Sequence, residues 1–201
     1  MSTFPDTSTT LLAKLAERET DVDQASWFRF FALYQPVMVE FARMRGAGDD
    51  AEDVVQDVFA DLVKVFQTGR YVRGKGQFKS YLATMLRNEL ISRFRRMQAK
   101  SRIGRAGAPR TPLPAPLPAP LAAPSADDMP VWNLARHRAA VEHVLTKTAL
   151  SEQSRQIYRE LLATGDSCAE VARRMNLPAA TVRQVKSRVS RMIAAFEKAT
   201  E

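Results

Sequence analysis

Apolar residues recur at helical spacing along most of the chain, and no segment shows the alternation of apolar and polar residues that marks a strand. The clearest case is residues 78–90, where one side of a helix would be apolar and the other polar and cationic. The apolar stripe consists of Phe78, Tyr81, Leu82, Met85, Leu86 and Leu90. The pattern predicts an all-α protein.

Caps and helix breakers set the expected helix boundaries. Before residue 104 we expect helices over residues 7–18, 26–45 and 49–66, and a fourth from residue 78 onward. After residue 130 we expect helices over residues 133–147, 151–164, 167–176 and 179–199. Ser167 and Glu170 have the spacing of a capping box, in which each side chain bonds a backbone amide of the other residue.

Residues 104–130 interrupt this helical pattern and hold most of the prolines of the chain, together with many alanines. Proline removes amide donors and favours extended backbone, so we expect a semi-rigid tether. A proline-rich docking ligand is the alternative, and a spacer is favoured over it. The tether divides the chain into two small helical domains, residues 1–103 and 131–201.

The net charge of +8 and the pI near 10.0 favour a polyanionic partner. The hydrophobic content of 45% is sufficient for a core. One cysteine, Cys168, allows no internal disulfide and is expected to be a small core side chain. The chain has no apolar run of about 18 residues and no secretion signal at its N-terminus, so we expect a cytoplasmic protein without membrane insertion.

Four acidic residues spaced by four, Asp49, Asp53, Asp57 and Asp61, would share one face of the helix over residues 49–66. Stacked like charges repel one another, so this face is best explained by a basic or polar partner that docks there. A merely solvated acidic face is the next alternative. A di-metal carboxylate site, with hydrolase activity, would want histidines on facing helices.

Both histidines of the chain lie in the other domain, which argues against a metal site. The chain also lacks phosphate-binding glycine loops, a nucleophile elbow and a Cys-x-x-Cys motif. We therefore expect no catalytic residues, no cofactor and no metal.

The polar face of the helix that begins near Phe78 suits a nucleic-acid strand, including an unpaired one. It combines hydroxyl groups, cations and an amide, and an aromatic loop precedes it. The residues of this face are Ser80, Thr84, Arg87, Ile91 and Arg95, with Asn88 at its edge and Tyr71 in the loop.

The last two predicted helices, joined at Asn176-Leu177-Pro178, form a helix-turn-helix pattern. Arginine and glutamine can reach base edges in the major groove, and lysine can contact phosphates. An ordinary amphipathic helix with a solvated basic face is the alternative. The residues expected to face DNA are Ala180, Thr181, Arg183, Gln184, Lys186, Ser187, Arg188 and Arg191.

Three segments together resemble bacterial sigma factors of the extracytoplasmic-function group of the sigma-70 family. DDAEDVVQDVFADLVKVF, from residue 49, is similar to region 2.2 of that family. GQFKSYLATMLRNELISRFRR, from residue 76, is similar to regions 2.3 and 2.4, and SCAEVARRMNLPAATVRQVKSRVSRMI, from residue 167, to region 4.2. The resemblance implies a region 2 helical bundle and a region 4 helix-turn-helix, joined by the Pro/Ala-rich tether.

The resemblance also implies partners and residue roles. The acidic helix would bind core RNA polymerase at the clamp helices of the beta-prime subunit, through Asp49, Asp53, Gln56, Asp57, Phe59 and Asp61. The −10 promoter element would be recognised and melted by Tyr71, Lys75, Gln77, Phe78, Lys79, Ser80, Tyr81, Thr84, Arg87, Asn88 and Arg95. The last helix would recognise the −35 element, and region 4 would meet the beta flap. Members of the family are often held by an anti-sigma factor, and some are governed by a kinase.

A stand-alone helix-turn-helix regulator with an N-terminal sensor or dimerisation domain is the alternative function. It gives the acidic helix and the basic tail of the first domain no joint role. The chain departs from the family pattern at Tyr81, where a tryptophan is usual, and at Lys79, where an arginine is frequent. Its Asn176 and Pro178 stand where many members have Gly and Ser.

Overall fold

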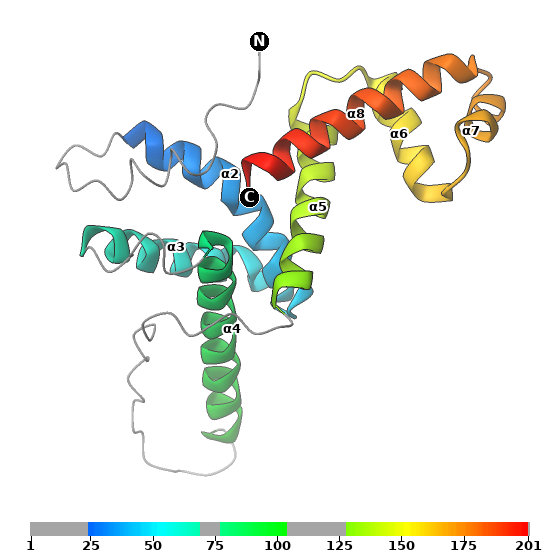
Figure 1. The fold of residues 1–201 in the computed structure, drawn as a ribbon. Coiled ribbons are helices and arrows are strands. Elements are labelled where there is room, and N and C mark those ends of the chain that lie inside the picture. Colours follow the sequence, from blue (N-terminus) through cyan, green and yellow to red (C-terminus); the bar gives the residue numbers. More distant parts are fainter. Residues whose placement is uncertain (1–23, 69–76, 104–127, 201) are drawn as a thin grey trace.

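The computed structural model describes residues 24–68, 77–103 and 128–200. Within them the predicted all-α class is confirmed, because every regular element is helical (Figure 1). The helix expected over residues 7–18, Tyr71 and Lys75 lie outside the described residues. The elements are α2 (Gln24–Met44), η1 (Gly48–Asp50), α3 (Ala51–Gln67), α4 (Phe78–Ile103), α5 (Asp128–Lys147), α6 (Glu152–Thr164), α7 (Cys168–Arg174) and α8 (Ala179–Ala199).

Helices α2, α3 and α4 pack around a cluster of aromatic rings. Phe30 of α2 lies at its centre, with ring centroids 4.8 Å from Tyr34, 5.9 Å from Phe59 and 5.6 Å from Phe78. The pairs with Phe59 and Phe78 are edge-to-face, a geometry that adds to the stabilisation that burial gives. The cluster fixes the two helices that carry the predicted polymerase and −10 residues.

The break between α2 and α3 falls where the glycines predicted it. Gly46 and Gly48 adopt positive φ angles of 91° and 56°, which glycine reaches without a steric penalty. The amide of Ala47 donates to the carbonyl oxygen of Ala42 at 3.0 Å and closes the end of α2. The one-turn helix η1 then leads directly into α3.

The caps of the C-terminal helices also agree with the sequence. The Ser167 hydroxyl accepts from the amide of Glu170 at 3.3 Å, and the amide of Ser167 donates to Glu170 Oε2 at 2.9 Å. Asn176 takes a left-handed conformation with φ 52°, which asparagine tolerates better than most residues. The capping box and the tight turn before α8 are therefore confirmed.

Helix α5 differs from the expectation in its beginning and in its packing. It starts at Asp128, so three residues that we assigned to the tether form its first turn. It packs along α2 and also contacts α4 and α8 (Figure 1). Trp132 is fully buried, with its ring 5.8 Å from that of Phe41 in α2. The first described helix of the predicted second domain thus lies against α2 and α4 of the predicted first domain.

Candidate nucleic-acid interface

The acidic face of α3 and η1 is open to solvent. Asp49, Asp53, Gln56, Asp57 and Asp61 are all exposed, as a docking surface requires. One carboxylate of this face is also held by a side chain of α4. Arg93 of α4 donates to Asp57 Oδ2 at 2.7 Å, and this hydrogen bond raises the pKa of Arg93.

Phe59 does not belong to that surface. Its side chain is 3% exposed and packs against Phe31, with ring centroids 4.0 Å apart, and against Phe30. The role implied for it as a polymerase contact stays a prediction, and in this conformation the ring lies in the core behind the acidic face. Helical periodicity puts Phe59 on the buried side of α3 with Val55 and Leu62, opposite the acidic residues.

The N-terminal part of α4 combines buried and accessible residues. Phe78 is buried in the aromatic cluster, beneath the predicted −10 surface. Gln77 is exposed, and its backbone carbonyl oxygen accepts hydrogen bonds from the backbone amides of Ser80 and Tyr81. Lys79 and Tyr81 are half-buried.

Further along α4 the surface is basic and partly apolar. Asn88 and Arg95 are exposed, as expected. Ile91, Phe94 and Met97 are exposed as well. Aromatic and aliphatic side chains among cations form a surface on which unstacked bases can lie.

Two of the predicted strand-binding residues contact the first turn of α5, and a third, Thr84, is buried within α4 beside them. The Ser80 hydroxyl lies 3.3 Å from Met129 Sδ, and Arg87 Nη1 lies 3.2 Å from Asp128 Oδ2. Thr84 is 7% exposed, and its hydroxyl donates to the carbonyl oxygen of Ser80. In this conformation α5 covers that part of the predicted −10 surface.

Arg45, at the end of α2, is a site residue that the sequence reasoning missed. Its Nη2 donates to Asp128 Oδ1 at 2.8 Å, so that Arg45 and Arg87 hold the two oxygens of one carboxylate. The Asp128 side chain is 1% exposed, whereas both arginine side chains are 28% exposed. The sequence gives no local signal for this pairing, because Asp128 stands 83 residues from Arg45.

Helix α8 presents its predicted DNA-facing residues to solvent. Ala180, Arg183, Gln184, Lys186, Ser187, Arg188 and Arg191 are exposed, and Thr181 is half-buried. The opposite side of α8 is buried through Val182, Val189, Ile193 and Phe196. A packed apolar stripe therefore holds a basic face outward along the whole helix.

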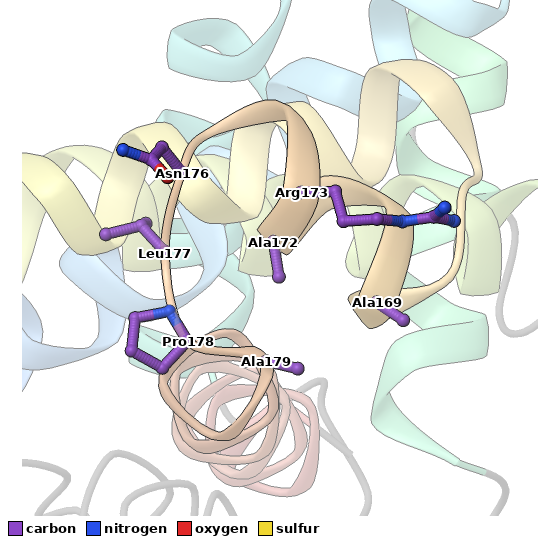
Figure 2. A pocket seen from close by; sticks show the side chains of 7 residues that line it. All are labelled: Ala169, Ala172, Arg173, Asn176, Leu177, Pro178 and Ala179. Carbon is purple, nitrogen blue, oxygen red and sulfur yellow. The ribbon is translucent and has the colours of Figure 1, made fainter.

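The turn before α8 borders an open depression of about 640 Å³. Figure 2 shows Asn176 and Leu177 in the turn, between Ala172 and Arg173 on one side and the start of α8 on the other. Arg174 of α7 pairs with Glu160 of α6 at 2.5 Å and with Asp166. The pKa of Asp166 is lowered mainly by its hydrogen bond from Arg174. These contacts hold α7 against α6 and so help to place α8.

Within the described ranges, no three His, Cys, Asp or Glu side chains gather as a metal ion would require. None of the helices in those ranges has the length and apolarity to cross a membrane.

Residues 30–100 match the family model of sigma-70 region 2. The matched range begins within α2, includes α3 and extends into the C-terminal part of α4. No curated protein matches the chain. The match supports a sigma-70 family factor. It ends before α5, so the −35 role of α8 is a proposal.

Proposed function

We propose that this chain is a sigma factor of the extracytoplasmic-function group, which binds core RNA polymerase and directs initiation at specific promoters in the cytoplasm. The observation that carries the proposal is the match of residues 30–100 to sigma-70 region 2. The exposed acidic face of α3, set beside the basic face of α4, supports the same function.

Each surface has a proposed partner. The acidic face of α3 binds the beta-prime clamp helices, and α4 binds the non-template strand of the −10 element. Helix α8 reads the −35 element in the major groove, and the second domain meets the beta flap. A chain of this kind needs no covalent chemistry, because binding energy is used to open the duplex and hold an unstacked base. An anti-sigma factor or a kinase is a further proposed partner.

The polymerase surface is tested with Asp53→Arg. Asp53 is exposed on α3, so the substitution should leave the fold intact and reverse one charge of the docking face. We expect at least a tenfold loss of affinity for core polymerase, and a matching loss of promoter-directed transcription with purified core enzyme.

Glu142→Arg is the control, because it makes the same change of charge at an exposed position on α5. It should retain the affinity of the unchanged chain. Equal affinities for Asp53→Arg, Glu142→Arg and the unchanged chain would remove the acidic face from the interface. Tight operator binding by a polymerase-free dimer would favour the stand-alone regulator instead.

The strand-opening role is tested with Asn88→Ala. Asn88 is exposed on α4, so its loss should not disturb the core. We expect reduced permanganate reactivity of thymines in the −10 region, with nearly unchanged binding of the closed promoter. If Asn88→Ala left the opening of the −10 region unchanged, Asn88 would have no role in strand opening.

A further inference from the structure

We propose that Arg45 and Arg87 form a binding site for a backbone phosphate of the promoter strand, which Asp128 occupies in the free chain. The inference rests on the proposed function and adds Arg45 to the DNA-binding residues. It also assigns α5 a role in limiting access of DNA to α4.

The site is a pair of guanidinium groups from two helices that hold one oxyanion. Arg45 comes from the end of α2 and Arg87 from the middle of α4, and each contacts a different oxygen of Asp128, at 2.8 and 3.2 Å. Guanidinium groups bind carboxylate and phosphate oxygens with the same planar geometry. A phosphate can therefore take the place of the carboxylate without a change in the protein groups.

The position of the pair agrees with a strand-binding role. Arg87 lies one turn beyond Thr84 and next to Asn88 on the helix predicted to hold the unpaired strand. The Arg45 guanidinium carbon also lies 5.6 Å from the centroid of the Phe41 ring, which holds that side chain near the site. Two nearby cations need a counter-charge, and a nucleic-acid strand supplies one at each nucleotide.

The occupant in the free chain comes from a helix end. Asp128 is the first residue of α5, where a negative side chain suits the positive end of the helix. Met129 covers Ser80 in the same turn. Because a first turn can open while the remainder of α5 stays packed through Trp132, a strand can displace Asp128 without unfolding the helix.

The experiment compares Asp128→Asn with Glu40→Gln in the full chain. Both changes remove one negative charge with little change of shape. Glu40 accepts from Arg138 at 3.0 Å, so it also joins α2 to α5, but it does not contact the arginine pair. The probe is a fluorescein-labelled oligothymidylate of about 20 nucleotides, a length that suits single-strand binding surfaces, and anisotropy gives the affinity over a series of salt concentrations.

We expect Asp128→Asn to bind the probe several-fold more tightly than the unchanged chain or Glu40→Gln. Each phosphate contact on a single strand contributes about 0.7 to the slope of log affinity against log salt. In Asp128→Asn, where Arg45 and Arg87 are both free to bind phosphates, the slope should be steeper than in the unchanged chain by up to about 1.4. In the double variant that also carries Arg45→Gln, the slope should become shallower again by about 0.7. Circular dichroism checks that each variant is folded.

Equal probe affinity for Asp128→Asn and Glu40→Gln would overturn the inference, as would a slope that Arg45→Gln leaves unchanged in the Asp128→Asn chain. The pair would then be only an ion pair that fastens α5. The proposed function is checked separately, by co-purification of the unchanged chain with core polymerase. If the chain binds polymerase but Asp128→Asn does not change probe binding, the proposed function stands and the proposed phosphate site is wrong.

Discussion

Phe59 and Gln56 stand three residues apart on α3 and lie in different environments. Phe59 contacts the rings of Phe30 and Phe31, whereas Gln56 is exposed beside the acidic residues. Sigma-family resemblance implies polymerase binding for both. The structure gives them separate roles, one in holding the helix in place and one in presenting a polar surface.

Phe59→Ala should therefore act on stability. Loss of a buried phenylalanine costs about 3 to 5 kcal/mol, because burial is lost and a cavity remains. Gln56→Ala should change the free energy of unfolding by less than about 0.5 kcal/mol, as exposed substitutions do. Urea denaturation followed by circular dichroism measures both. Similar values for the two variants would mean that Phe59 is not a core residue in solution.

At the scale of whole elements, local signals predicted the C-terminal helices well. Pro178 sets the start of α8, and Ser167 with Glu170 sets the start of α7, so the structure gives α8 the bounds expected from sequence. These devices act within a few residues of one another. Sequence periodicity also identified the apolar and polar sides of α3 and α4, because both helices are amphipathic over several turns.

Contacts between residues far apart in the sequence could not be predicted from these local signals. Helix α5 begins at Asp128, before the expected Asn133, because its first turn binds Arg45 and Arg87 of other helices. Proline-rich composition placed residues 128–130 in the tether, and tertiary packing overrides that preference. The contact of Met129 with Ser80 belongs to the same first turn and could not be seen in the sequence.

The contact between α5 and α8 includes an ionisable ring, that of His143, so we expect its strength to depend on pH. The ring of His143 lies 4.9 Å from that of Phe196, and burial, followed by the charge of Lys147, lowers its pKa below the usual 6.5. The folded state thus prefers neutral His143. Its contribution to stability is complete above the pKa of the unfolded chain and is lost as the pH falls below about 6.5 toward the lowered pKa.

We expect the melting temperature to fall more between about pH 7.5 and 5.5 in the unchanged chain than in His143→Gln, which cannot be protonated there. His137 is present in both proteins and so does not distinguish them. Thermal melts followed by circular dichroism at the two pH values measure the difference. An equal fall of the melting temperature in both proteins would show that protonation of His143 does not destabilise the folded state.

In the whole molecule, α5 is the element that connects the two halves. It contacts α2 and α4 on one side and α8 on the other. A promoter would have to reach the polar face of α4 and the basic face of α8 at the same time. While α5 contacts Ser80 and Arg87, the α4 face is only partly available. If the proposed function holds, full engagement of DNA would require at least the first turn of α5 to move.

This arrangement can be tested with the two tryptophans, because they lie in different environments. Trp132 is fully buried between α5 and α2, whereas Trp27 is only partly buried near Phe66. Acrylamide should therefore quench the fluorescence of Trp27→Phe, which retains Trp132, less than that of Trp132→Phe, which retains Trp27. If α5 were a loosely tethered helix in solution, Trp132 would be the more accessible ring and the order would reverse. Collisional quenching constants for the two variants decide between a docked and an undocked α5.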